Sequence, residues 1–566
     1  MSRHQAPRDA GFIERPELAA VAAGFRRIKL APFDGPPIRD LGILDTGVAH
    51  IRAVRDAIGD EAVVLIDIHQ KLEHEELLPA VRAMEDELFA AQGRWIEADI
   101  SSPAGPVTVA MPWVQVPWQL RRTVVVPSPL PQTTTQATGP FSPANAPLGT
   151  ARGLKPGRVT WAYNPEVTRW NGTTGTWWSD ENLNPAGVAD MFRQALRAQA
   201  DANDDASAWD ALFRHFNASR GRGSAGYTHG QKIAIKLNLN VVTVHAYSGQ
   251  GAFSAPQLVE ALVRQLIENA GVPPAAIALY DATRYIPDAI YNRFQGPETE
   301  GLRFIDFAGG SGRDQVVRDL ESEIYWSFDV QGNPTYLPKC VTEADYLINL
   351  ASLRGHNLAG VTLCAKNHFG TICADLDGQP TLQAPQGANL HGTVAAHDYS
   401  WRVPDWSWKQ RPMGSYNALV DLMAHPRVGE NTLLFMLDGF YVPHDQNADV
   451  TGECVWESAP FNGRWTSSLF LSQDGVAIDS VGLDFVRSEP TINRLPDVMP
   501  PHTTCENYLH EAALSPQCPS GTTYDPTLTG QPSASLGVHE HWNSATAKAY
   551  SRNLGTGEGI ELVSIT

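Results

Sequence analysis

The sequence predicts an α/β protein: a large three-layer α/β/α domain with a mainly parallel sheet, preceded by a short βαβαβ partial-barrel fragment. Two observations predict this fold class. Strand-like apolar runs alternate with helical patterns over residues 22–100 and again over 146–566, and parallel strands require such crossover helices. Residues 101–145 are rich in Pro, Thr and Ser, a composition typical of a linker. Residues 1–21 are expected to be disordered.

Composition and charge exclude several classes of protein. The 566-residue chain has a formal charge of −19, with 43% hydrophobic and 19% charged residues. The negative charge argues against a nucleic-acid or anionic-membrane partner, and no apolar run approaches the ~20 residues that span a bilayer. The six cysteines form no Cys-x-x-Cys pair, so we expect no iron–sulfur cluster. A small-molecule ligand is the expected partner. The sequence does not indicate how many copies of the chain assemble.

The beginning of the sequence bears on the compartment. The segment MSRHQAPRDAGFIERPE lacks the hydrophobic region of a secretory signal, so the chain as written is expected in the cytoplasm. The periplasm is the alternative if the native N-terminus differs. The cysteine spacing permits either compartment.

Residues 22–100 contain three strand-like and two helix-like stretches, which alternate. The pieces KLAPFDG, IRAVRDAIG, LIDIH and WIE resemble the enolase superfamily, in particular its mandelate-racemase-like barrels. By that resemblance, Asp67 and Glu97 fall where the family places its first two magnesium ligands. The capping domain, the third carboxylate ligand and the later catalytic strands have no counterpart here. We therefore interpret this fragment as a non-catalytic remnant with a vestigial metal site.

The elements of residues 146–566 follow from hydrophobic periodicity. The clearest βαβ unit has strands at 232–237 and 278–280 and a helix that opens at Ser254 and Pro256 and ends at Gly271. Further strands are predicted at 158–163, 303–307, 346–350, 433–437 and 476–478, and further helices at 185–200, 208–217 and 416–424.

The most distinctive stretch is residues 345–370, DYLINLASLRGHNLAGVTLCAKNHFG. It presents His356, Lys366, Asn367 and His368 after a buried strand, and ligands bind at the carboxyl ends of strands in open α/β sheets. We predict catalytic roles for Lys366, His356 and His368 and substrate binding by Asn367. Three such groups close together favour a site over a purely structural use, in which they would hydrogen-bond strand-end carbonyls.

Other polar residues at strand ends are candidates for the same site. Lys236, Asn238 and Asn240 alternate along one strand and so share a face, and Arg284 ends another strand. We predict that all four bind substrate. An exposed edge strand is an equally good interpretation of the alternation.

Three carboxylates form a second set of candidates. Asp438 ends an apolar strand, and Asp474 and Asp479 follow in the piece LSQDGVAIDS. They are candidate ligands for a divalent metal. The alternative is an Asx turn at Asp438 and helix capping by Asp474 or Asp479.

Residues from about 145 to the C-terminus resemble the family called domain of unknown function 362. The pieces KIAIKLNLN, SAPQLV, the 345–370 stretch and GVHEHWNSATAKAYSRNLGTGEGIEL carry this resemblance. The family implies no established activity. A more distant similarity is to lactate racemase, a nickel-pincer enzyme, because His356, Gly360 and Lys366 have the spacing of its His-Gly-Lys motif. That similarity implies a covalent role for Lys366 toward a cofactor or carbonyl, with His356 or His368 as metal ligand or base.

Three hypotheses for the function follow. The first is an enzyme that acts on a small polar or anionic substrate, of isomerase or redox type, with a divalent metal (Ni, Mg or Fe) or a Lys-attached cofactor. The second is a non-catalytic metal- or cofactor-binding accessory protein. The third is an enolase-derived chimera whose N-terminal segment is inactive. His539-Glu540-His541 resembles a metal-ligand triplet, but no third ligand is evident, which favours a structural use.

Overall fold

The computed structural model describes residues 142–328, 335–356, 359–374, 390–394, 411–493 and 503–566, together with three short strands before them. The chain divides into two compact units. One comprises Met1–Thr134 with Tyr399–Trp406, and the other comprises Thr135–Asp398 with Ser407–Thr566.

The described part of the first unit is a three-stranded parallel sheet. Its strands are β1 (Arg27–Leu30), β2 (Val63–Asp67) and β3 (Ala98–Asp99), in the order β1-β2-β3. This arrangement agrees with the parallel strands expected from the sequence. Asp67 is the last residue of β2, whereas Glu97, the two expected helices and residues 1–21 lie outside the described residues.

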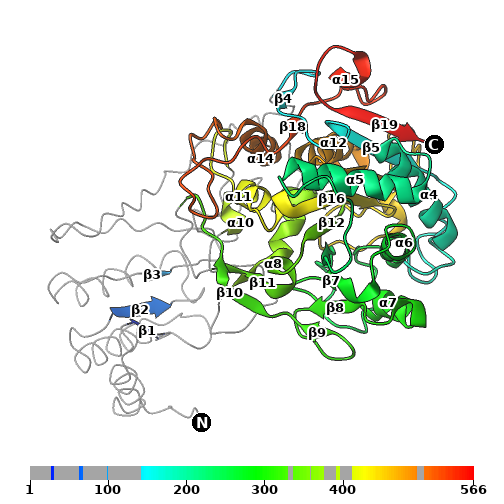
Figure 1. The fold of residues 1–566 in the computed structure, drawn as a ribbon, viewed down its shortest axis with the longest axis horizontal. Coiled ribbons are helices and arrows are strands. Elements are labelled where there is room, and N and C mark those ends of the chain that lie inside the picture. The colour runs from blue at the N-terminus through cyan, green and yellow to red at the C-terminus, as the bar shows by residue number, and fades with distance from the viewer. Residues whose placement is uncertain are drawn as a thin grey trace, which may run out of the picture. The chain divides into compact units, whose positions relative to one another are not determined.

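The second unit is built on a sheet in which nine described strands pair in the order β19-β5-β17-β16-β12-β6-β7-β8-β9 (Figure 1). Every pair is parallel except the two that involve β17. The strands are β5 (Arg158–Tyr163), β6 (Ile233–Lys236), β7 (Ile277–Tyr280), β8 (Arg303–Asp306), β9 (Asp314–Gln315), β12 (Tyr346–Ser352), β16 (Thr432–Gly439), β17 (Ser468–Ser472) and β19 (Glu561–Ile565). The carboxyl ends of the parallel strands therefore meet at one edge.

Helices cover both faces of this sheet and make three layers, as the sequence predicts. The helices α4 (Pro185–Ala200), α5 (Asp205–Ser219) and α6 (Pro256–Glu268) pack on one face. The other face is covered by α9 (Cys364–Asn367), α11 (Ala418–Ala424), α12 (Gly475–Arg487) and α14 (Thr503–Leu514). Successive strand residues alternate between the two cores, so that Ile233 and Ile235 contact one layer and Ala234 the other.

The helix α4 shows how the sequence determines these layers. The Asn184 side chain accepts hydrogen bonds from two backbone N–H groups of the first turn, and Pro185 occupies the first helical position. The predicted apolar face is buried against the sheet: Val188, Met191, Phe192, Ala195 and Leu196. Burying that face supplies most of the stability of such a helix.

One predicted strand is wrong. Residues 476–478 belong to α12, and the strand of this region is β17, which ends at Ser472. Asp474 caps the helix by accepting hydrogen bonds from Val476 N and Ala477 N. The short apolar run fits either structure by itself, and the side-chain cap selects the helix.

Short elements complete the described fold. Three small antiparallel sheets are described. One contains β10 (Arg318–Glu323), β11 (Thr335–Pro338) and β15 (Cys373–Ala374), the second β13 (Arg354–His356) and β14 (Gly360–Thr362), and the third β18 (Val538–His539) and β4 (Leu148–Gly149). The short helices are α7 (Asp288–Tyr291), α8 (Lys339–Thr342), α10 (Leu390–Thr393), α13 (Pro490–Asn493) and α15 (Ser551–Leu554). Among the described helices, none combines the length and apolar character that a bilayer crossing requires.

Candidate functional site

The candidate site lies at the carboxyl edge of the parallel strands, around the ends of β6, β7 and β12. Lys236 is the last residue of β6, Asp281 follows β7, and Asn349 is within β12. Because these three strands are adjacent and parallel, their polar ends converge at one place.

A buried ion pair forms the base of the site. Lys236 Nζ lies 2.9 Å from Asp281 Oδ2 and donates a further hydrogen bond to Leu237 O, and the lysine side chain is 1% exposed. Burial lowers the pKa of Lys236, and the Asp281 carboxylate opposes that shift. Gly370 covers the ammonium group so closely that an added Cβ would lie 2.7 Å from Nζ. The pair is therefore sealed beneath the chain.

Four buried polar side chains form a connected network next to this pair. Arg354 NH2 donates to Asn238 Oδ1 at 2.5 Å, and Asn238 Nδ2 donates to Asn367 Oδ1 at 3.0 Å. Asn367 Nδ2 then donates to Asn349 Oδ1 at 2.8 Å. The predicted residues Asn238 and Asn367 thus contact each other directly. Such a satisfied network fixes the loops that carry the site.

His368 is a neutral member of the same network. Its ring is fully buried, and its Nε2 lies 2.9 Å from Asn349 Nδ2. Burial, with the charge of Lys236, lowers the pKa of His368 to about 3. Since an amide N–H is a donor, His368 Nε2 accepts this hydrogen bond. His368 is held in place from within the network.

His356 lies on the short strand β13. Its Nδ1 accepts a hydrogen bond from Ala359 N at 3.1 Å. Burial, followed by the charges of Lys366, His391 and Arg354, lowers the pKa of His356 well below its usual range. The effect of Lys366 shows that the two groups on which the sequence hypothesis depends lie within electrostatic range of each other.

Lys366 differs from the other cations of the site. Burial, followed by the charges of Arg284, Lys236 and Arg354, lowers the pKa of Lys366 to about 7. No hydrogen-bond acceptor or carboxylate partner of Nζ is found within the described residues, and Nζ lies 4.2 Å from the centre of the Phe369 ring. Lys366 is thus a half-buried residue whose amine lies among positive charges.

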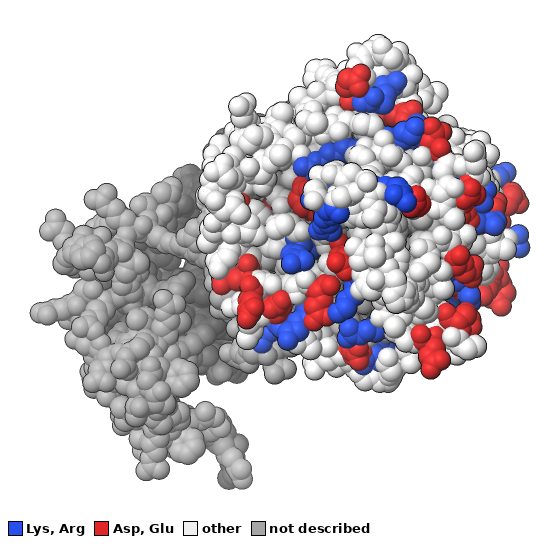
Figure 2. Space-filling view, in the orientation of Figure 1, with Lys and Arg blue, Asp and Glu red and all other residues white. Residues whose placement is uncertain are grey.

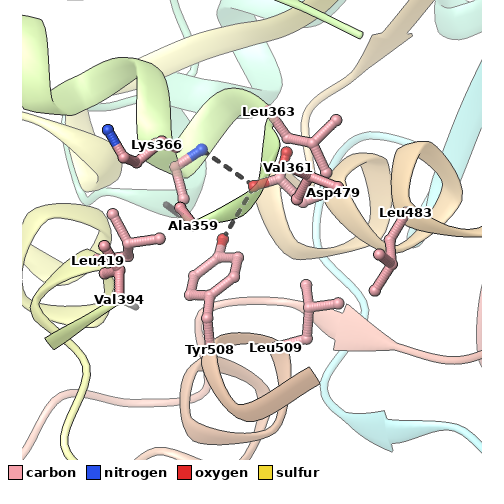
Figure 3. Close-up of a pocket in the computed structure, with 11 residues that line it drawn as sticks. Ala359, Val361, Leu363, Lys366, Val394, Leu419, Asp479, Leu483, Tyr508 and Leu509 are labelled. Atoms are coloured by element: carbon pink, nitrogen blue, oxygen red, sulfur yellow. Dashed lines mark hydrogen bonds between the residues drawn. The ribbon is translucent and has the colours of Figure 1, made fainter. Parts of the chain in front are cut away.

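A small pocket lies beside Lys366 (Figure 3). Apolar side chains line most of it, including Val361, Leu419 and Leu483. Lys366 extends its amine away from Asp479, which lies at the opposite side of the pocket. The pocket therefore joins an apolar wall to one ionisable amine, a combination common in small-molecule sites.

The three candidate metal carboxylates do not gather into one cluster. Asp438 accepts hydrogen bonds from Ala255 N, at the start of α6, and from Phe440 N. Asp474 accepts four backbone N–H bonds, from Arg152, Val476, Ala477 and Val538. Burial raises the pKa of both carboxyl groups to about 6. These contacts favour the turn and cap roles over metal ligation.

Asp479 contacts the start of the helix that carries Lys366. Its two oxygens accept hydrogen bonds from Cys364 N at 2.8 Å and Ala365 N at 3.0 Å, which are the first residues of α9. Tyr508 donates its hydroxyl to the same carboxylate (Figure 3). Burial raises the pKa of Asp479 to about 7. The carboxylate holds the start of the short helix that presents Lys366.

Two predicted residues lie at the margin of the site. Arg284 donates to Asn240 O at 2.6 Å and to Thr283 O at 2.8 Å. Asn240 Nδ2 donates to Gln446 O and Asn447 Oδ1. The structure thus brings Arg284 and Asn240 together, and Arg284 also contributes charge at Lys366.

Four participants were missed by sequence reasoning: Asp281, Asn349, Arg354 and His391. Asp281 was detectable because it directly follows a predicted strand that neighbours the one with Lys236. His391 carried no such signal, because it comes from the short helix α10, far along the chain.

The absence of a nucleic-acid partner stays a prediction from the sequence, and Figure 2 shows the charges on one face of the described residues. Basic and acidic side chains are interspersed on the face shown in Figure 2, without a continuous basic area there. Nucleic-acid surfaces typically gather Lys and Arg on one face.

Two parts of the chain match known protein families. Residues 233–484 match the family described as Domain of unknown function (DUF362). This part of the chain is therefore similar to that family. The match runs from β6 to α12, inside the range expected from the sequence, and contains the strand-end residues of the site and Lys366, whereas Tyr508 lies outside it. Residues 14–102 match the family described as Enolase C-terminal domain-like, which includes β1–β3. No curated protein matches the chain significantly.

Proposed function

We propose that the part of the chain similar to DUF362 binds a small anionic molecule at the carboxyl ends of β6, β7 and β12, and that Lys366 contacts it. The observation that carries this proposal is the uncompensated charge at Lys366. Arg284, Lys236 and Arg354 all lower its pKa, and no carboxylate among the described residues counteracts them. A carboxylate or phosphate group would supply the missing negative charge.

Lys366 can also take part in chemistry. With a pKa of about 7, its amine and ammonium forms are both populated near neutral pH. The amine form can attack a carbonyl carbon or remove a proton, and the ammonium form can return one. An isomerase or redox reaction at a carbon that bears a hydroxyl or carbonyl group fits these properties. The short 2-hydroxy acids and 2-oxo acids combine that carbon with an anionic group.

The test is calorimetric titration with inorganic phosphate, lactate and pyruvate. We expect at least one anion to bind, and Lys366→Met to weaken its binding about tenfold or more, since a charged hydrogen bond contributes about 1.5 to 3 kcal/mol. Lys232→Met is the matched control, because Lys232 precedes the opposite end of β6 and pairs with Glu343 at the surface. Equal binding by the Lys366→Met and wild-type proteins would contradict the proposal.

A non-catalytic binding role is the second candidate. It is favoured by the satisfaction of Asn238, Asn367 and His368 within one network, which leaves them few free contacts for chemistry. Incubation with pyruvate and borohydride followed by intact-mass analysis separates the two roles. An adduct at Lys366 supports imine chemistry, whereas anion binding without adduct or turnover supports the accessory role.

The enolase-like segment has its own test. Glu97 lies outside the described residues, so its role depends on measurement. Magnesium binding that is lost in Glu97→Gln would support a working site there, and its absence in the wild-type protein would support the inactive remnant.

A further inference from the structure

A second group of polar side chains lies at the C-terminal side of the large unit, beyond the part that matches DUF362. Glu506 comes from α14, and His539 and His541 come from β18 and the residues after it. All three are buried, with exposed fractions of 0%, 0% and 2%. His510 lies one turn after Glu506 on α14, and its Nε2 is 2.7 Å from Ser142 Oγ and 3.8 Å from Glu506 Oε2.

The distances in this group match those of a tetrahedral metal site. Glu506 Oε2 lies 3.0 Å from His541 Nε2, 3.4 Å from His539 Nε2 and 3.8 Å from His510 Nε2. Metal–ligand bonds of about 2.0 to 2.1 Å place neighbouring tetrahedral ligands about 3.3 Å apart. The ring nitrogens of His539 and His541 thus lie at the spacing of an ion shared with Glu506, and that of His510 lies farther from the carboxylate.

The hydrogen bonds on the other ring nitrogens show which atoms face the centre. The Ser480 hydroxyl donates to Val476 O at 2.8 Å, so its oxygen accepts from His539 Nδ1 at 2.9 Å. The proton of a neutral His539 is then on Nδ1, and Nε2 presents a lone pair. His539 Nε2 is buried, and it makes no hydrogen bond within the described structure. This lone pair faces the Glu506 carboxylate 3.4 Å away, and a cation bound by both groups would stabilise the arrangement.

His541 also has a hydrogen-bond partner on Nδ1, and its Nε2 lies at hydrogen-bond distance from Glu506 Oε2, 3.0 Å away. Its Nδ1 lies 2.7 Å from Asp484 Oδ1 and, because a carboxylate only accepts, donates to it. Asp484 in turn accepts hydrogen bonds from Trp542 N and Tyr550 Oη. Carboxylate–histidine pairs of this kind orient metal ligands and increase their basicity.

We propose that Glu506, His539 and His541 bind one zinc ion, and that His510 becomes the fourth ligand by exchanging its contact with Ser142 for the ion. Nitrogen ligands with one carboxylate suit Zn²⁺, and burial of all of the ligands but His510 is typical of a structural site. The ion would join α14 to the C-terminal segment that contains His539 and His541. Ser480 and Asp484 of α12 also contact these two histidines. This inference stands independently of the anion site.

Elemental analysis of the full-length protein, purified without chelator, tests the proposal. We expect about one zinc per chain, and a fall in Tm when a strong chelator removes the metal. After dialysis against Co²⁺, the chain should show the visible absorption of tetrahedral cobalt. These measurements on the wild-type protein do not depend on whether a variant folds.

Variants assign the metal to these residues. Glu506→Gln and His539→Gln should each lower zinc affinity at least tenfold, whereas His229→Gln, which alters an exposed histidine, should retain one zinc per chain. The competing arrangement is a protonated His541 that bridges Glu506 and Asp484 without an ion. A wild-type chain that takes up neither Zn²⁺ nor Co²⁺, with a Tm unaffected by chelator, would establish that arrangement and overturn the proposal.

Discussion

The strand-end site around Lys366 and the histidine cluster around Glu506 have opposite electrostatic character. At the first, Arg284, Lys236 and Arg354 add positive charge around an amine that has no described carboxylate partner. At the second, imidazole nitrogens converge on a carboxylate oxygen. The comparison teaches that the two sites favour ligands for different reasons: Lys366 has no carboxylate partner among the described residues, whereas Glu506 is already paired with Arg487 and the arrangement of ring nitrogens carries the zinc proposal.

The largest expected effect concerns the buried pair beneath the anion site. Lys236→Met leaves Asp281 buried without its partner and should lower the free energy of unfolding by roughly 3 to 5 kcal/mol. Lys232→Met, which breaks an exposed pair, should cost at most about 1 kcal/mol. Urea unfolding followed by circular dichroism measures both. A similar small loss in the two variants would mean that Lys236 is not held as the structure shows.

The second prediction concerns the support of the cluster. Asp484→Asn keeps the size of the side chain but weakens the acceptor of His541 Nδ1. Zinc affinity should fall about 10- to 100-fold, measured by competition with a chromophoric chelator. Asp210→Asn, at an exposed pair with Arg214, is the control and should leave the affinity unchanged. An unchanged zinc affinity in Asp484→Asn would contradict a role of the Asp484–His541 pair in zinc binding.

The third prediction is the pH dependence of anion binding. The pKa of Lys366 is lowered to about 7, so the charged form that attracts an anion disappears as the pH rises through 7. Affinity should therefore be greatest below pH 7 and fall by up to about tenfold per pH unit above it. Lys366→Met should abolish this slope in calorimetry at pH 6, 7 and 8. A wild-type affinity that is constant from pH 6 to 8 would contradict the role of Lys366.

Stability should show the opposite trend with pH. The unfolded lysine retains its proton up to its ordinary pKa of 10.5, whereas the folded one loses it near 7. Between these values the unfolded state binds more protons, so the contribution of Lys366 to stability increases with pH. Compared with Lys366→Met, the wild-type chain should gain stability from pH 7 to pH 10. The difference in urea midpoint between the two proteins measures this gain.

The smallest expected effect tests the independence of the two regions. Tyr508→Phe removes one hydrogen bond to Asp479 and should cost about 0.5 to 1.5 kcal/mol of stability. Zinc content should remain at the wild-type value, because the hydroxyl faces the pocket and not the cluster. Loss of zinc in this variant would show that the two sites are one unit.

The sequence predicted the layers better than it predicted the contacts. Periodicity identified the buried face of α4 and the strand β6, which ends with Lys236, because those patterns are local. The short run at Val476 was misassigned because its structure depends on the cap at Asp474. Placing Lys366 and His356 near each other was a prediction that their electrostatic interaction supports, while their chemical roles stay predictions.

Glu506, the third member of the histidine cluster, shows why other contacts could not be predicted from the sequence. His539 and His541 were recognisable as alternate residues, but Glu506 comes from α14 and meets them only through tertiary packing. The same holds for Asp474 and Asp479, whose oxygens accept backbone N–H groups from distant segments. Local patterns do not determine which backbone groups a carboxylate will meet.

The helix α14 presents different side chains to the two regions. Tyr508 and Leu509 line the pocket beside Lys366, whereas Glu506 and His510 belong to the histidine cluster. One helix therefore contributes residues to both proposed binding sites. Thermodynamic reciprocity then applies: if occupancy by the ion alters the dissociation constant of the anion by some factor, the anion must alter that of the ion by the same factor.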